Sequence, residues 1–246
     1  MLQAAPRRTA KRDGMDKRIL GRIYSRLIHK YFLNDMYLDL RVRAKKDSVD
    51  YIEANLKDAM LCQGRKPLIE LCMKREKEAK LNGLILEFGV AGGTSTKIIA
   101  RNAEPRTVHG FDSFEGLPGD WSGTHEQTGR YTQHGKLPKV PANVKLHKGW
   151  FDQTLPGFLA ANPGPVSFIN VDCDVYDSTK YVLEQLADRM RVGTVIMFDE
   201  YYNYPNWREH EYKAWQEFVA ARKVTYRYTG FSTMRYHAAV QITGIG

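Results

Sequence analysis

The sequence predicts an α/β fold, and residues 84–94 are the main reason. They begin with a short apolar run that is typical of a buried strand. Gly89, Gly92 and Gly93 follow, and then the hydroxyl residues 94–96 precede a second apolar run, which is a helix-start signal. A strand, a glycine-rich turn and a helix form the unit with which α/β folds present backbone N–H groups to an anionic group.

A second observation is an acid at the end of the next predicted strand, residues 107–112. Asp112 lies 20 residues after Gly92. An acid at this spacing can accept hydrogen bonds from ribose hydroxyls. The turn lacks the Gly-x-Gly-x-x-Gly spacing of a dinucleotide fingerprint, and a ligand-free turn would explain the glycines alone. The acid makes a nucleoside-containing cofactor the better interpretation.

A third observation is that strands and helices continue to alternate. Three further strands are predicted at residues 143–147, 165–171 and 193–198. Residues 224–228 and 235–243 alternate apolar and polar side chains, as in a closing hairpin. The loop 113–141 shows little periodicity, and structureless segments of this length are usually functional or mobile.

Length and composition fit one such domain with an extension. The chain has 246 residues, of which 43% are hydrophobic, and this supports a normal core. No apolar run reaches the roughly 18 residues of a membrane span, and no signal-peptide core precedes the domain. The three cysteines form no Cys-x-x-Cys pair, which favours reduced thiols and a cytoplasmic protein.

The net charge of +9 is confined to residues 1–46, which hold 13 Lys and Arg against 4 Asp and Glu. The remainder holds 24 of each and is neutral. Residues 1–14 are predicted to be disordered, and residues 16–32 to form a basic amphipathic helix. Such a helix can lie on a membrane, contact nucleic acid or act as a mitochondrial presequence. Packing on the domain or on a second subunit is the simpler interpretation.

Residues 47–246 are therefore predicted to form the main domain, behind a basic extension of residues 1–46. Residues 47–80 have helical spacing throughout, and we expect them to form a helical lid over the glycine turn. We also expect the chain to be a homo-oligomer, most simply a dimer.

Acids recur at or just after the ends of predicted strands: Glu87, Asp112, Asp172, Asp199 and Glu200. In a parallel sheet these ends meet at the edge where ligands bind. Clustered acids repel one another unless something positive binds between them. With Asp112 assigned to ribose and Glu87 to the turn or a ligand amine, three acids remain. Together they are suited to Mg²⁺.

The alternative is that these acids cap helices and bind loop backbone. For Asp172 and Asp199 we prefer the metal interpretation. For Asp174, which is close in sequence, capping and a role in the site are equally supported.

Several segments resemble a known family. Residues 87–93, Glu-Phe-Gly-Val-Ala-Gly-Gly, look like motif I of class I S-adenosylmethionine-dependent methyltransferases. Residues 110–118, 172–179 and 198–201 are similar to segments of the macrocin O-methyltransferase family, whose members methylate sugar hydroxyls of natural products with Mg²⁺. The resemblance covers about residues 84–243, and residues 1–60 match much less clearly.

This resemblance implies a Rossmann-like, doubly wound sheet of seven mostly parallel strands with a C-terminal antiparallel hairpin. It also implies a sugar O-methyltransferase that uses S-adenosylmethionine and Mg²⁺ or Mn²⁺. The implied metal ligands are Asp172, Asp199 and the residue after it. The family commonly has Asp-Asp there, whereas this chain has Asp199-Glu200, whose second side chain is one methylene longer. Residues 204–211 also depart from the antibiotic enzymes.

The expected cofactor contacts are Glu87, Gly89, Val90, Gly93, Thr94, Ser95, Asp112, Ser113, Gly149, Trp150, Phe151 and Asp172. Methyl transfer from a sulfonium is an in-line displacement, so placement of the acceptor oxygen supplies much of the rate. Coordination to Mg²⁺ lowers the pKa of a sugar hydroxyl, and Asp172 could take its proton. His210 is a weaker candidate base, and an exposed helix residue is the preferred interpretation of it.

Other functions remain open at this point. A catechol-like or other vicinal diol could chelate the same metal. An RNA-binding protein could use the basic extension, although the neutral body shows no recognised RNA-binding motif. A noncatalytic subunit would bind the cofactor without turnover.

Overall fold

The computed structural model describes residues 21–24, 26 and 35–246. The chain divides into two units, Met1–Leu40 and Arg41–Gly246. Residues 21–24 and 26 are helical, and the rest of the predicted basic helix lies outside the described residues, as does the tail 1–14. Helix α2 (Met36–Asn55) contains the boundary between the units. None of the described helices is long and apolar enough to cross a bilayer.

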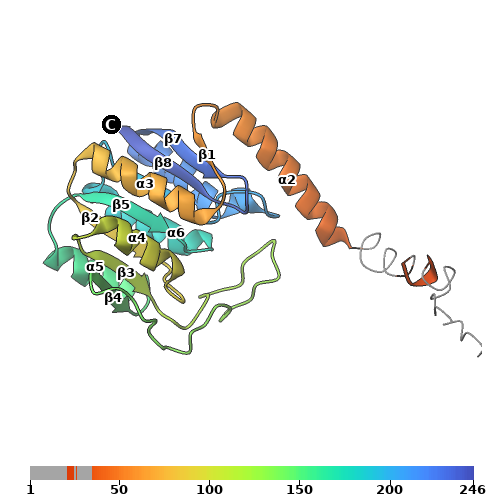
Figure 1. Cartoon of the computed structure of the whole chain (residues 1–246), viewed down its shortest axis with the longest axis horizontal. Coiled ribbons are helices and arrows are strands. Elements are labelled where there is room, and N and C mark those ends of the chain that lie inside the picture. Colours follow the sequence, from red (N-terminus) through yellow and green to blue (C-terminus); the bar gives the residue numbers. More distant parts are fainter. Residues whose placement is uncertain (1–20, 25, 27–34) are drawn as a thin grey trace, which may run out of the picture. The chain divides into compact units, whose positions relative to one another are not determined.

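The second unit is built on one mixed sheet (Figure 1). Its strands are β1 (Met60–Cys62), β2 (Leu84–Phe88), β3 (Val108–Asp112), β4 (Val144–Lys148), β5 (Val166–Val171), β6 (Val195–Phe198), β7 (Val224–Ser232) and β8 (Ala238–Ile245). Their order is β1-β7-β8-β6-β5-β2-β3-β4. Only β8 is antiparallel to its neighbours, β6 and β7. The predicted α/β class and the closing hairpin are confirmed.

The sheet has eight strands, one more than the seven predicted. Residues 47–80 are not helical throughout, because β1 separates α2 from α3 (Arg65–Ala79). In β1, Leu61 lies opposite Phe231 of β7. The strand satisfies N–H and C=O groups at the end of β7 that a helix there would leave unpaired. Three residues are too few to show a strand periodicity in the sequence.

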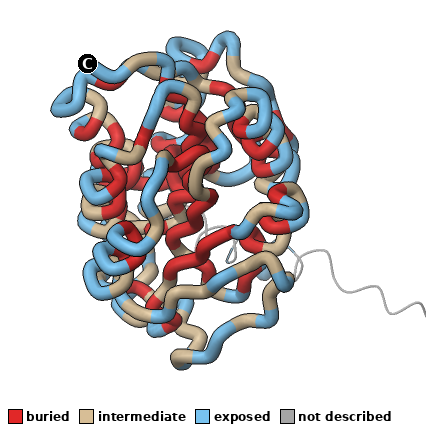
Figure 2. Tube along the Cα trace, turned by 90° about the vertical axis from the view of Figure 1, so that its left-hand side faces the viewer, coloured by how far each residue is buried: buried red, intermediate tan, exposed pale blue. Residues whose placement is uncertain are grey.

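Helices cover both faces of the sheet. The remaining helices are α4 (Thr94–Ala103), α5 (Phe151–Ala161), α6 (Tyr176–Leu186) and α7 (Glu211–Arg222), with short 3₁₀ turns η2 (Ala187–Arg189) and η3 (Trp207–Glu209). Helices α3 and α4 pack together on one face, and α5, α6 and α7 lie on the other (Figure 1). Figure 2 shows that the buried residues concentrate along the strands between these layers.

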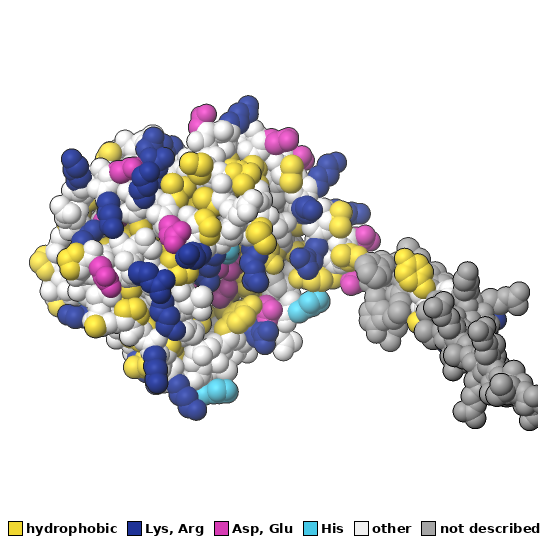
Figure 3. Space-filling view, viewed as in Figure 1, with side chains coloured by type: hydrophobic (Ala, Val, Ile, Leu, Met, Phe, Trp, Pro, Cys, Tyr) yellow, Lys and Arg dark blue, Asp and Glu magenta, His cyan; other side chains and the backbone are white. Residues whose placement is uncertain are grey.

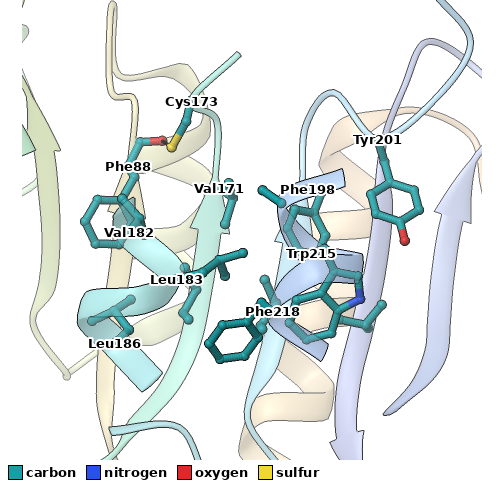
Figure 4. Close-up of a cluster of buried hydrophobic side chains, with 14 of the residues drawn as sticks. Phe88, Val171, Cys173, Val182, Leu183, Leu186, Phe198, Tyr201, Trp215 and Phe218 are labelled. Atoms are coloured by element: carbon teal, nitrogen blue, oxygen red, sulfur yellow. Dashed lines mark hydrogen bonds between the residues drawn. The ribbon is translucent and has the colours of Figure 1, made fainter. Parts of the chain in front are cut away.

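The larger core lies under α5, α6 and α7. Strand residues Phe88, Val171 and Phe198 meet Leu183 of α6 and Trp215 of α7 there, and all five are fully buried (Figure 4). Burying a large apolar side chain contributes about 1.5–3 kcal/mol. Since each of these strand residues directly precedes a turn at the carboxyl edge, the core holds that edge rigidly.

The segment 47–80 has two distinct parts. Helix α3 packs Leu68, Ile69 and Cys72 against the sheet, and its first residue, Arg65, lies at the carboxyl edge of the strands. In α2, Asp47 accepts a hydrogen bond from the indole of Trp207 at 3.0 Å. A lid formed by residues 47–80 stays a prediction.

Candidate active site

The carboxyl ends of β2, β3, β5 and β6 open into one cavity of about 1160 Å³. It is lined by residues 64–65, 89, 91, 112–113, 116–121, 126, 131, 150–152, 172–175, 177–178, 181, 199–200 and 234–237. Figure 3 shows acidic side chains recessed in a hollow on this side of the molecule. The cavity therefore brings together the glycine turn and the strand-end acids, as the sequence predicts.

The glycine turn is shaped by the close approach of β2 and β5. Gly89 has a φ of 91°, and a Cβ at this position would lie 1.8 Å from the carbonyl oxygen of Asp172. No side chain fits there, so the turn can pass beside the end of β5 only as glycine. Gly93, with a φ of 73°, is the N-cap residue directly before α4.

Asp112 holds this turn in place. Its Oδ2 accepts hydrogen bonds from the backbone N–H groups of Val90 at 2.8 Å and Ala91 at 2.7 Å. Its Oδ1 accepts from the N–H of Phe114 at 2.6 Å. A carboxylate has about four acceptor sites, so Oδ1 keeps capacity for a ribose hydroxyl. Asp112 also lines the cavity.

The expected cofactor residues divide into two groups. Those that line the cavity are Gly89, Asp112, Ser113, Trp150, Phe151 and Asp172. Those that do not line it, and lie in or beside the turns, are Glu87, Val90, Gly93, Thr94, Ser95 and Gly149. The binding role of each stays a prediction.

Glu87, which belongs to the second group, supports the glycine turn from below. It is fully buried, and its Oε1 accepts a hydrogen bond from Asn170 of β5 at 3.1 Å. Burial raises the pKa of Glu87, and the nearby hydroxyl of Ser95 opposes this shift. Glu87 thus ties β2 to its neighbour beneath the turn.

The structure groups three acids closely. Asp172, Asp174 and Glu200 each offer a carboxylate oxygen, and these oxygens lie within 4.8 Å of one another. Asp174 adopts a left-handed backbone with a φ of 60°, which is uncommon for a residue other than glycine. We call these three residues the acid cluster.

Asp199 has different partners. Its Oδ1 lies 2.7 Å from Nε of Arg65 and 3.1 Å from Nδ1 of His237. The same guanidinium donates a hydrogen bond to Asp172. The sequence predicts Asp172, Asp199 and Glu200 as the metal ligands, whereas the close grouping contains Asp174 in place of Asp199.

Burial and mutual repulsion dominate the electrostatics. Burial raises the pKa of Asp172 and of Glu200, and the charge of Asp199 raises each further. Burial likewise raises the pKa of Asp174, reinforced by Asp172. Burial also disfavours ionisation of Asp199, but the charge of Arg65, together with His237 and a hydrogen bond from Glu200, outweighs burial and lowers the pKa of that carboxyl.

The acid cluster fits a hard divalent cation. Its donors are all oxygens, which Mg²⁺ and Mn²⁺ prefer. Oε2 of Glu200 is buried and has no hydrogen-bond partner within the described part of the chain. An orphaned buried oxygen among like charges is a group that a bound cation would satisfy.

Three residues of the site were not predicted from the sequence: Arg65, Glu211 and His237. Arg65 directly follows Gly64, whose φ of 99° marks the start of α3, and this pair is the only local signal. Nothing in the sequence around Glu211 or His237 distinguishes them from ordinary helix and strand residues.

His210 is not the exposed helix residue expected. It is buried, and its Nε2 lies 2.9 Å from the carbonyl oxygen of Ser122. Its ring also lies beside Trp121. His210 therefore joins the start of α7 to the loop over the cavity.

That loop, residues 113–141, is irregular as predicted but well packed. Leu117 and Gly129 face each other, with the N–H of Gly129 donating to the carbonyl of Leu117 at 2.9 Å. Trp121 is buried against Tyr204. Trp121 and Tyr131 both line the cavity and give this side an aromatic wall.

Fold and site together define a class: the Rossmann-like methyltransferase fold, here with the glycine turn and the acid cluster in one cavity. Among solved structures, the O-methyltransferase NovP has a TM-score of 0.57 at 22% identity, over 73% of this chain and 80% of that one. The calicheamicin methyltransferase CalS11 has a TM-score of 0.55 at 20% identity, over 97% and 99%. These likenesses establish the fold.

The family follows from the sequence comparison. The family model described as macrocin O-methyltransferase (TylF) matches residues 25–230. The chain belongs to this family. The match begins well before residue 84, so it reaches further toward the N-terminus than the resemblance read from the motifs.

One curated relative is an 8-demethyl-8-(2,3-dimethoxy-alpha-L-rhamnosyl)-tetracenomycin-C 4'-O-methyltransferase of Streptomyces olivaceus. It is 30% identical over 155 residues, which are 54% of this chain and 58% of the relative. The chain thus spans little more than half of that relative's length.

Proposed function

We propose that the chain transfers the methyl group of S-adenosylmethionine to a sugar hydroxyl of a glycoside, with a divalent cation held by the acid cluster. The observation that carries this proposal is that one cavity is lined both by Asp112 and Gly89 of the glycine turn and by Asp172, Asp174 and Glu200. The relative from Streptomyces olivaceus, whose name specifies a rhamnosyl acceptor, supports the choice of a sugar.

The size of the cavity supports two ligands at once. Pockets for one drug-sized ligand are about 300–1000 Å³, and this cavity of about 1160 Å³ is larger. The cofactor would lie against Gly89, Asp112 and Trp150, where S-adenosylmethionine supplies the methyl group. The acceptor would then face Trp121 and Tyr131.

The acid cluster would serve the acceptor hydroxyl. A divalent cation there supplies Lewis acidity that lowers the pKa of a hydroxyl bound to it. The backbone carbonyl of Asp172 adjoins Gly89 of the glycine turn, and the carboxylate of Asp172 would take the proton. Arg65 would keep Asp172 and Asp199 oriented.

The charges beyond the cluster favour a neutral acceptor over a sugar nucleotide. Asp120, Glu126, Asp152 and Asp177 also line the cavity, whereas its arginines are Arg65, which is paired with Asp172 and Asp199, and Arg235. Arg130, just outside, is paired with Glu126 at 2.7 Å. Phosphates in such surroundings would meet like charge. The aromatic wall offers apolar surface to the face of a sugar ring instead.

The test is a panel of acceptors incubated with radiolabelled S-adenosylmethionine. The panel contains rhamnosides and other neutral glycosides, nucleotide-linked sugars and a catechol, each with Mg²⁺ and with excess chelator. We expect label in neutral glycosides, loss in chelator and recovery with Mg²⁺ or Mn²⁺. Full activity in chelator would contradict the metal role, and labelling of the catechol alone would contradict the sugar.

A further inference from the structure

Glu211, the first residue of α7, joins the two turns that carry the acid cluster. Its Oε1 accepts a hydrogen bond from the backbone N–H of Cys173 at 3.2 Å. Its Oε2 accepts one from the backbone N–H of Glu200 at 3.0 Å. Cys173 stands between Asp172 and Asp174, so the side chain of Glu211 links the turn that carries these two acids to the turn that carries Glu200.

This bridge requires a group with two acceptor oxygens. A glutamine at the same place would offer one oxygen and one NH₂, and the NH₂ would face a backbone donor. Glu211 is fully buried, so water cannot replace a lost acceptor. The geometry of the bridge is therefore specific to a carboxylate.

The turn that Glu211 holds is unusual. Asp174 has its φ of 60°, and the N–H of Val175 donates back to the carbonyl of Cys173 at 2.6 Å. Backbone in the left-handed region costs energy for a residue with a side chain and persists only where its surroundings enforce it. The hydrogen bond from the N–H of Cys173 to Glu211 holds the start of this turn in place.

Helix packing alone does not explain Glu211. A buried carboxylate is costly, and Asp172, Asp174 and Asp199 add repulsion to it. Its two hydrogen bonds go to the cluster turns, and both cross to other parts of the chain, 38 and 11 residues away. The residue thus acts on the spacing between Asp172, Asp174 and Glu200.

We propose that Glu211 is a positioning residue that sets the distance between the Asp172–Asp174 turn and Glu200, and through it the affinity for the divalent cation. This inference rests on the proposed function, in which the acid cluster holds that cation. Residues that hold metal-ligating residues in place do not contact the metal themselves, and their loss typically weakens metal affinity by about 10–100-fold.

The experiment compares Glu211→Gln with the wild-type full chain by calorimetric titration with Mn²⁺, and separately with S-adenosylmethionine. The matched control is Glu217→Gln on the same helix, where the exposed carboxylate accepts a hydrogen bond from Tyr176 at 2.6 Å. We expect Mn²⁺ affinity to fall about 10–100-fold in Glu211→Gln. Cofactor affinity should stay within about twofold of wild type, and the control should match wild type in both titrations.

A second readout separates positioning from general support of the fold. In Glu211→Gln, the Mg²⁺ concentration for half-maximal turnover should rise, and saturating Mg²⁺ should restore most of the rate. Should Glu211→Gln not fold, Glu211→Asp keeps the charge but is one methylene too short to span both N–H groups, and the same loss of Mn²⁺ affinity is expected.

The outcomes are distinguishable. Unchanged Mn²⁺ affinity in Glu211→Gln, with wild type binding normally, would overturn this inference alone. Parallel losses of Mn²⁺ and cofactor affinity would also overturn it, because they would show a role in the fold as a whole. No Mn²⁺ binding by the wild-type chain would overturn the metal role in the proposed function, and this inference with it.

Discussion

The two sides of the cavity treat their carboxylates differently. At the glycine turn, on the side proposed for the cofactor, Asp112 accepts three backbone hydrogen bonds that shape the turn. At the acid cluster, on the side proposed for the metal, Asp172, Asp174 and Glu200 lie together, and the pKa of each is raised. The guanidinium of Arg65 is paired with Asp172 of this cluster and with the neighbouring Asp199.

The number of backbone hydrogen bonds to a carboxylate thus distinguishes an acid that stabilises the fold from an acid that is suited to bind a ligand. Backbone donors stabilise Asp112 whether or not a cofactor is bound, so this acid has a place in the apo fold. The acid cluster lacks equivalent donors, and its arrangement costs energy that a cation would recover. Changes on the first side should therefore affect cofactor binding, and changes on the second side should affect metal binding and turnover.

The largest effect is expected for Asp172→Asn. The substitution removes a ligand charge and the proposed base, so turnover should fall by about 10²–10⁴-fold. Affinity for S-adenosylmethionine should stay within a few-fold, because the backbone carbonyl of Asp172 beside Gly89 is unchanged. Steady-state kinetics and calorimetry measure the two. A wild-type rate would show that the hydroxyl is activated elsewhere.

The next prediction compares Asp174→Asn with Asp199→Asn to decide which of the two acids contributes to metal binding. The grouping of oxygens predicts that Mn²⁺ affinity falls at least about tenfold in the first variant and less in the second. Asp199→Asn should instead lower the free energy of unfolding by about 1.5–3 kcal/mol, since Arg65 loses a charged partner. Mn²⁺ titration and chemical denaturation test both. The reverse order of metal affinities would restore Asp199 as a ligand, as the sequence predicts.

On the cofactor side, Asp112→Ala should weaken binding of S-adenosylmethionine by about tenfold, the equivalent of about 1.4 kcal/mol. The substitution frees the N–H groups of Val90 and Ala91 and removes the acceptor for ribose. Asp120→Ala is the control, because Asp120 is an exposed lining residue that accepts hydrogen bonds from Thr128. Equal affinity in wild type and Asp112→Ala would remove Asp112 from the cofactor site.

The smallest effect concerns a titratable pair that belongs to neither side. His109 of β3 lies with its Nδ1 3.1 Å from Nε2 of His147, and burial, helped by His147, lowers the pKa of His109 to about 4. The unfolded chain therefore takes up this proton at higher pH than the folded protein does. The stability that neutral His109 contributes is present above its ordinary pKa and is lost as pH falls toward 4. Between pH 7 and pH 5.5 the loss is about 1 kcal/mol.

His109→Phe removes this titration while keeping an aromatic ring against Phe158. Denaturation measured at both pH values should then show a weaker pH dependence than wild type. An identical pH dependence in the two proteins would mean that His109 does not contribute to it.

Much of the fold could be predicted from the sequence, because most strands and the turns after them are marked by contiguous residue patterns. The strand run ending at Phe88, the glycines after it and Asp112 at the next strand end are all contiguous signals. Strand β1 could not be predicted, because Met60–Cys62 forms a strand only where β7 provides a partner. Its existence depends on a contact between residues far apart in sequence.

The same distinction between local sequence patterns and long-range contacts applies to the site. Strand-end acids are visible in the sequence, since topology brings the ends of parallel strands together. The close grouping of Asp174, instead of Asp199, with Asp172 and Glu200 is not visible in the sequence, because it depends on where the side chains lie in the folded turns. Glu211 was equally hidden, as its partners are backbone groups of other elements.

The two outer strands of the sheet have a consequence for the behaviour of the protein at high concentration. A long, flat outer strand offers unpaired backbone groups to any passing chain and promotes edge-to-edge aggregation. Here one outer strand, β1, is only three residues long. The other, β4, carries the exposed lysines Lys145 and Lys148, whose charge opposes a second strand. Both edge strands therefore disfavour pairing with a strand of another chain, although the sheet does not close into a barrel.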